Sequence, residues 1–90
     1  MIHVNIWVTG KVQGVNFRAT TREKALEYDL HGFVCNEMNG SVYIEVEGAD
    51  EKINKLLEWC SCGPSHAQVT NVTVDHGDVK GFSGFEVRRH

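Results

Sequence analysis

The segment GKVQGVNFR, residues 10–18, places two glycines and an arginine at a spacing suited to binding an anion. Gly10 and Gly14 can adopt positive-φ conformations that let successive backbone amides converge on one point. Arg18 adds a planar, permanently charged group that can contact a phosphate through two N–H donors. Two interpretations are open at this point: a phosphate cradle, or a plain strand-to-helix turn with a solvated Arg18. The candidate amide donors are those of Val12, Gln13, Gly14, Val15 and Asn16.

This segment is not a Walker A loop, because Gly14 is followed by Val15 and Asn16 rather than by Lys and Ser or Thr. A second cluster, Cys60 with Cys62 and His66, has a spacing compatible with metal binding, but no fourth ligand follows it. We therefore predict no metal site. The remaining histidines are scattered along the chain and are expected at the surface; they are His3, His31, His76 and His90.

The elements that must position these residues follow from hydrophobic periodicity. Alternation with period 2 predicts strands, and spacings of three and four residues predict helices. Asp50 is the expected N-cap of the second helix, and the Asn39-Gly40 pair favours a hairpin turn. A change of phase between Val69 and Val72 indicates a β-bulge. The predicted strands are 2–10, 32–36, 41–48, 67–77 and 85–89, and the predicted helices are 18–30 and 50–62.

The order of these elements is βαββαβ with a short extra strand at the C-terminus. Right-handed crossovers then place both helices on one face of a mostly antiparallel sheet, which is a ferredoxin-like α/β sandwich. The other face of the sheet is expected to be open to water. This fold supports many activities and does not identify one.

Length and composition predict a single domain over residues 1–90. The net charge of −3 and pI of about 5.9 argue against nucleic acid as the main partner. The first ten residues lack the features of a signal peptide, and no run is long enough to cross a membrane. Three cysteines, an odd number, suit reduced thiols. We therefore expect a cytoplasmic protein without a membrane partner.

Two long motifs carry a family resemblance. VTGKVQGVNFR and GFVCNEMNGSVYIEVEG closely resemble the signature segments of acylphosphatases, small ferredoxin-like enzymes that hydrolyse carboxyl phosphates. The likeness continues through Gly63-Pro64 to the Phe85-x-Val87-Arg88 ending, so it covers nearly the whole chain. The resemblance implies a hydrolase that acts on a small-molecule acyl phosphate, without a cofactor or metal, and we expect it to be a monomer.

The resemblance also assigns roles to individual residues. The amides of residues 12–16 would bind the phosphoryl oxygens, Arg18 would hold the same group, and Asn36 would orient the attacking water. Gly10 and Thr21 would have supporting roles. Two positions depart from the family pattern: Ala19 stands where a larger residue is common, and Cys35 precedes Asn36 where other residues are usual.

An alternative function is a single-stranded RNA-binding sheet of the RRM type. Trp7 and Tyr43 are expected on the open face, where such domains stack bases. Glu45 and Glu47 would share that face and repel a phosphate backbone, and the RNP1 consensus is missing from NGSVYIEV. A third possibility, a phosphate-binding module without turnover, is disfavoured because Arg18 and Asn36 are both present.

Overall fold

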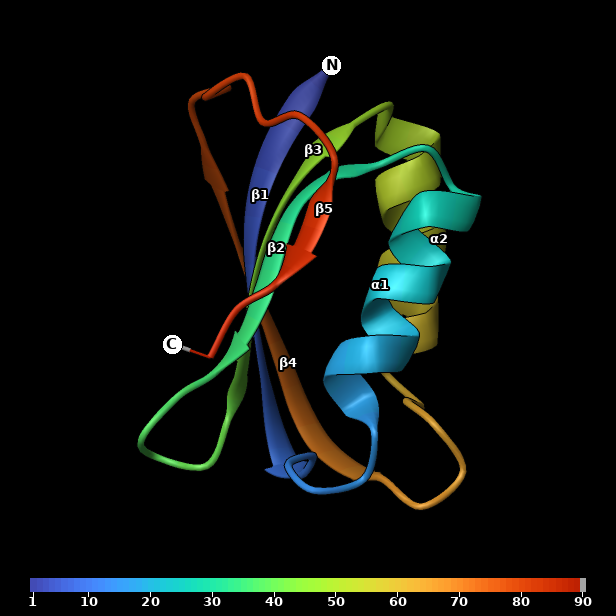
Figure 1. The fold of residues 1–90 in the computed structure, drawn as a ribbon, viewed down its shortest axis with the longest axis vertical. Coiled ribbons are helices and arrows are strands. Elements are labelled where there is room, and N and C mark those ends of the chain that lie inside the picture. The colour runs from blue at the N-terminus through green and yellow to red at the C-terminus, as the bar shows by residue number, and fades with distance from the viewer. Residues whose placement is uncertain (90) are drawn as a thin grey trace.

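The computed structural model describes residues 1–89 and has two layers, a sheet and a pair of helices on one of its faces (Figure 1). The strand order is β4-β1-β3-β2-β5, with β2 and β5 parallel and the other pairs antiparallel. The predicted ferredoxin-like arrangement is confirmed. The elements are β1 Ile2–Lys11, α1 Phe17–Glu27, β2 His31–Asn36, β3 Val42–Gly48, α2 Asp50–Cys60, β4 Gln68–Gly77 and β5 Phe85–Val87.

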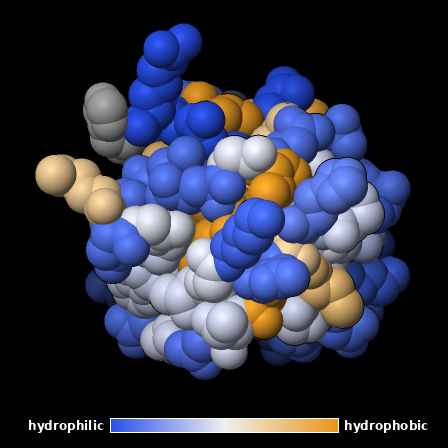
Figure 2. All heavy atoms as spheres, turned by 90° about the horizontal axis from the view of Figure 1, so that it is seen from below, coloured by the Kyte–Doolittle hydropathy of each residue, from blue (hydrophilic) through white to orange (hydrophobic). Residues whose placement is uncertain are grey.

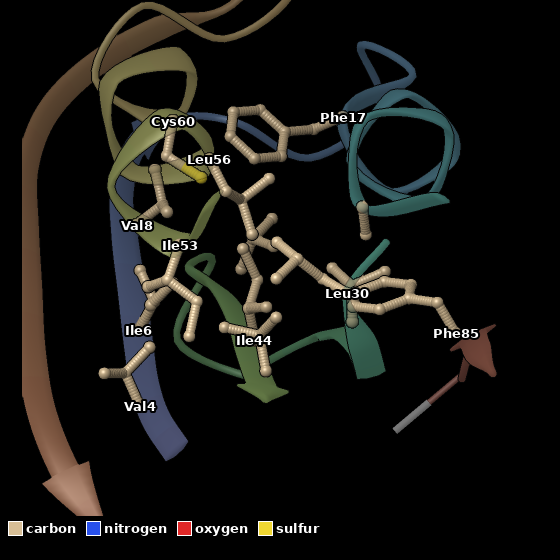
Figure 3. Packing of buried hydrophobic residues seen from close by; sticks show 14 of the residues in the cluster. Val4, Ile6, Val8, Phe17, Leu30, Ile44, Ile53, Leu56, Cys60 and Phe85 are labelled. Carbon is tan, nitrogen blue, oxygen red and sulfur yellow. The ribbon is translucent and has the colours of Figure 1, made fainter. Parts of the chain in front are cut away.

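The hydrophobic core lies between the helices and the sheet (Figure 3). Alternate residues of β1 and β3 face the helices, because successive side chains of a strand point to opposite faces. From α2, the residues at positions i, i+3 and i+7 complete the core, as their helical spacing predicts. Among the described residues, no helix is long and apolar enough to cross a membrane. The labelled core residues of Figure 3 are Val4, Ile6, Val8, Phe17, Leu30, Ile44, Ile53, Leu56, Cys60 and Phe85.

The predicted bulge is present in β4, opposite the end of β1. Thr9 pairs with Asn71, but Gly10 pairs with Val69, so Thr70 is the extra residue. Gly10 has φ of 124°, and a side chain there would clash with the carbonyl oxygen of Gln68. A glycine is thus required at position 10, where β1 lies against the bulge of β4.

The helices differ from the prediction at their ends: α1 is Phe17–Glu27 instead of 18–30, and α2 ends at Cys60 instead of residue 62. The cap of α2 also differs. The N-cap of α2 is Ala49, with φ of −67° and ψ of 139°, and Asp50 is the first helical residue. No side chain caps this helix; instead Asp50 and Glu51 place negative charge in its first turn. Their interaction with the helix dipole takes the place of a capping hydrogen bond.

The second face of the sheet is not open throughout, contrary to the prediction. Because β4 and β5 lie at opposite edges, residues 78–84, which we call the crossing segment, pass over this face near the N-terminus of β1 (Figure 1). The carboxylate of Glu47 accepts hydrogen bonds from the amides of Lys80, Gly81 and Phe82. Glu47 is consequently only 1% exposed.

His3 lies beneath the same segment, so the expectation that it is a surface residue is wrong. Its Nδ1 lies 2.8 Å from Glu47 Oε2 and its Nε2 lies 2.8 Å from Asn5 Oδ1. The ring stacks on Phe82 with a centroid separation of 6.0 Å. His31 is half-buried and His76 is exposed, while His90 lies outside the described residues.

Candidate active site

The loop of residues 12–16 lies between β1 and α1, at the lower end of Figure 1. It turns sharply because Gly14 and Asn16 both have positive φ, 73° and 67°. Asn16 is the N-cap of α1, but its side chain makes no capping hydrogen bond. The first turn of α1 therefore begins without a side-chain acceptor for its amides, which are the groups that bind anions at helix N-termini.

The amides of residues 12–16 are available to a ligand. The hydrogen bonds within residues 1–89 use none of these five N–H groups as a donor. Backbone N–H groups that lack a partner in the protein must bond to water or to a ligand. At a helix N-terminus, the dipole favours an anionic ligand.

Arg18 lies in the first turn of α1 and is held by the C-terminal segment. Its Nη1 donates to the carbonyl oxygen of Arg88 at 3.2 Å. The guanidinium of Arg88 in turn lies 3.9 Å from the centre of the Phe33 ring, a cation–π contact. The bond to Arg88 uses one of the five N–H donors of the Arg18 guanidinium. The protein thus orients the Arg18 side chain through one hydrogen bond, and the remaining N–H donors of the guanidinium are available to a ligand.

Asn36 is the last residue of β2, as predicted, and the oxygen of its side-chain amide lacks a hydrogen-bond donor within residues 1–89. Its Oδ1 is buried and has no hydrogen-bond partner among the described residues. A buried acceptor without a donor costs about 1–3 kcal/mol, so such atoms are few in proteins and each calls for an explanation, such as a catalytic role or a bound water. The orphaned oxygen is a place for a donor that the protein itself does not supply.

These groups meet in one pocket with a volume of about 260 Å³. Figure 2 views the molecule from below, the end at which the loop lies in Figure 1, and shows hydrophobic patches between hydrophilic side chains. The pocket brings together the loop, Arg18 and Asn36, although Arg18 and Asn36 are 18 residues apart in sequence. Its lining residues are Val12, Gly14, Asn16, Phe17, Arg18, Ala19, Asn36 and Val87.

Four predicted residues lie outside the lining. Gly10 is at the bulge, Gln13 turns its side chain to the hairpin after β2, and Val15 is half-buried beside the core. Thr21 is buried and donates to the carbonyl of Phe17 at 2.8 Å, so it contacts its own helix. The supporting roles expected of Gly10 and Thr21 remain predictions.

Val87 also lines the pocket, and the sequence does not predict this. It enters through the parallel pairing of β5 with β2, where Val87 lies opposite Val34. No local pattern near residue 87 signals this contact. Ala19, which departs from the family pattern, also lines the pocket.

The cysteines lie apart from the pocket lining. Cys35 is buried, and burial together with Glu37 raises the pKa of its thiol, although Arg88 and Arg18 oppose this. Burial raises the pKa of Cys60 to about 12, whereas Cys62 is exposed. Within residues 1–89, no group of three or more His, Cys, Asp or Glu side chains could hold a metal ion.

The sheet face proposed for RNA binding does not have the arrangement that an RNA-binding surface needs. Trp7 and Tyr43 do lie side by side, with ring centroids 5.1 Å apart. The Tyr43 hydroxyl, however, donates to the Glu45 carboxylate at 2.7 Å, and the crossing segment covers part of the same face. A half-covered sheet face that carries carboxylates does not favour a nucleic-acid backbone.

Comparison with known proteins places the chain in a family. The family model for acylphosphatase matches residues 4–87. An acylphosphatase of Syntrophus aciditrophicus is 47% identical over 88 residues, covering 97% of this chain and 92% of that protein. The acylphosphatase structure from Bacillus subtilis has a TM-score of 0.95 at 30% identity and covers 98% of this chain and 99% of that one.

A second solved structure agrees with the first. An acylphosphatase from Coxiella burnetii has a TM-score of 0.94 at 40% identity, and the match covers 97% of this chain and 92% of the other. Family membership also disfavours the RNA-binding alternative. This chain belongs to the acylphosphatase family of hydrolases.

Proposed function

We propose that this protein hydrolyses acyl phosphates by in-line attack of a water molecule that Asn36 orients. The amides of residues 12–16 and the guanidinium of Arg18 hold the phosphoryl group. In phosphoryl transfer, negative charge spreads over the three equatorial oxygens, and catalysis consists mainly of positioning and electrostatic stabilisation. Backbone amides and one arginine can provide both.

The leaving group explains why no general acid is needed. An acyl phosphate is a mixed anhydride, and the bond that breaks joins phosphorus to a carboxylate oxygen. A carboxylic acid has a pKa of about 4–5, judged by carboxyl side chains, so the carboxylate departs without a proton. The bond that forms joins the water oxygen to phosphorus. The water proton passes late to a phosphate oxygen, because an amide is too weak a base to remove it early.

The observation that carries this proposal is the orphaned Oδ1 of Asn36. It is buried and lacks a donor, and Asn36 is one of the residues that line the pocket together with Arg18 and the loop. A water molecule bonded there would donate one hydrogen to Oδ1 and direct a lone pair at the phosphorus atom. Because Asn36 ends a strand of the sheet, its direction is set by the rigid part of the fold.

We further propose that the protein acts as a cytoplasmic monomer on small acyl phosphates, without metal, nucleic acid or membrane. The small pocket supports a small substrate. A chelator should therefore leave turnover unchanged, and an aryl phosphate monoester should be cleaved far more slowly than an aromatic acyl phosphate, because its leaving group is more basic.

The test of the roles is turnover of benzoyl phosphate by two variants. Arg18→Ala and Asn36→Ala should each lower kcat/KM by about 10²-fold or more, the scale for losing one preorganised stabilising group. Arg22→Ala is a matched control, because Arg22 also donates to a carbonyl of the C-terminal segment, that of Phe85 at 3.1 Å, but does not line the pocket. Asn54→Ala, on the exposed face of α2, controls for Asn36. Parental rates in both active-site variants would refute the assignment.

A further inference from the structure

The side chain of Gln13 joins the two separate parts of the site. Its Nε2 donates to the carbonyl oxygen of Glu37 at 2.8 Å and to that of Ser41 at 2.9 Å. Gln13 belongs to the loop of residues 12–16, whereas Glu37 and Ser41 are the first and last residues of the turn between β2 and β3. One amide group thus uses both of its hydrogens to link the loop to this turn.

The linked turn is the one that holds Asn36. Asn36 precedes Glu37 directly, and it pairs with Val42, the residue that follows Ser41. Gln13 therefore contacts both ends of the turn, one residue beyond the pair that contains Asn36. Since Gln13 is also between Val12 and Gly14, which line the pocket, it connects the anion-binding amides to the orphaned oxygen.

The hairpin itself does not depend on these bonds. The amide of Glu37 donates to the Ser41 carbonyl at 2.8 Å, and the amide of Gly40 donates to the Glu37 carbonyl at 3.1 Å. Asn39 Oδ1 accepts from the amide and the hydroxyl of Ser41. If Gln13 lost its amide group, both carbonyls would keep a donor, so the turn would retain its shape. What would be lost is the fixed position of the hairpin relative to the loop.

We infer that Gln13 is a positioning residue whose side chain sets the placement of Asn36 relative to the phosphate-binding loop. The inference rests on the proposed function, because it assigns Gln13 an effect on the attacking water and not on phosphate binding. In-line attack requires the water oxygen and phosphorus to approach within about 3–3.5 Å in alignment. A hairpin free to shift by an ångström would retain phosphate affinity but lose this alignment.

The test separates phosphate binding from turnover in Gln13→Met, which keeps the length of the side chain and removes the donors. We expect kcat for benzoyl phosphate to fall by about 10- to 100-fold, the scale for a misplacement of about 1 Å. The inhibition constant of inorganic phosphate should change less than about threefold, because the loop amides and Arg18 remain. Gln68→Met, at an exposed position of β4, is the matched control and should behave as the parent.

A double-mutant cycle then tests whether Gln13 acts through Asn36. In an Asn36→Ala background, Gln13→Met should lower kcat by less than about twofold, because the group it positions is already absent. Thermal unfolding of each variant verifies that it is folded. If Gln13→Met perturbs the fold, Gln13→Asn gives the same reading: its amide is too short to reach the hairpin, so kcat should again fall with unchanged phosphate inhibition.

Three results would overturn the inference: a parental kcat for Gln13→Met, an equal loss of phosphate affinity and turnover, or a full additional loss in the Asn36→Ala background. These outcomes are distinct from a failure of the proposed function. If Asn36→Ala itself retained parental turnover, the role of Asn36 would be refuted. If Asn36→Ala were impaired and Gln13→Met were not, only the inference about Gln13 would fail.

Discussion

Replacement of Glu47 by glutamine should destabilise the fold by about 3 kcal/mol at neutral pH. Burial by itself would raise the pKa of the Glu47 carboxyl, but its hydrogen bonds to the crossing segment and to His3 lower it from 4.5 to about 2. A difference of about 2.5 pKa units between the unfolded and folded states corresponds to about 3 kcal/mol. Glutamine would also turn an NH₂ group toward backbone amides that need an acceptor.

The stabilisation that Glu47 contributes to the fold should decrease at low pH. Because the pKa of Glu47 is lower in the folded state, its stabilisation is fully present above the unfolded-state value near 4.5. It decreases as the pH falls and is lost as the pH passes through about 2. The difference in unfolding free energy between the parent and Glu47→Gln should therefore be about 3 kcal/mol at pH 7 and roughly half of that near pH 3.

Urea denaturation at a series of pH values measures this difference directly. With a slope of about 1 kcal/mol per molar urea, the midpoint of Glu47→Gln should lie about 3 M below that of the parent at pH 7. Glu23→Gln, at an exposed position of α1, is the matched control and should shift the midpoint only slightly. A difference below about 1 kcal/mol at pH 7, or one that does not change between pH 7 and pH 3, would show that Glu47 does not hold the crossing segment.

Two further predictions concern the loop glycines and the thiols. Gly10→Ala should unfold far more easily than Gly14→Ala, since a Cβ at residue 10 would clash with the β4 backbone, whereas nothing lies within 4 Å of a Cβ at residue 14; thermal melting compares the two, and similar melting temperatures would contradict this account of the bulge. A thiol reagent at pH 8 should modify one cysteine per folded chain, Cys62, without loss of turnover, because Cys35 and Cys60 are buried. Titration of three thiols in the native protein would be inconsistent with that burial.

Elements with a strong local pattern were predictable from the sequence. The alternation in β1 and β3 and the helical spacing in α2 gave the order and the layers, and the phase change in residues 69–72 gave the bulge at Thr70. These features depend on which face of an element is buried, and residue types record that directly. The cap of α2 was misplaced by one residue, since Asp50 can stabilise the helix from inside its first turn as well as from the cap.

The crossing segment could not be predicted, because residues 78–84 have no periodicity. Their place depends on β4 and β5 being at opposite edges of the sheet, which is a property of the strand order. The same long-range geometry buries His3 and also Glu47, whose residue type is mostly exposed in proteins. The residues next to Glu47 in the sequence therefore do not indicate that its carboxylate is buried among backbone amides.

The candidate site likewise has one part that a local sequence pattern predicts and another that depends on long-range strand pairing. The loop and Arg18 are contiguous, so a motif of nine residues contains them, whereas Val87 and the carbonyl of Arg88 reach Arg18 only through the parallel pairing of β5 with β2. Phe33 then contacts both Arg88 and Phe82, with ring centroids of the two phenylalanines 5.8 Å apart. The crossing segment is thus linked to Arg18 by direct contacts through Phe33 and Arg88. A change at Glu47 that loosens the crossing segment would therefore alter the orientation of Arg18 through these contacts. It would not act on the loop amides, which lie between β1 and α1.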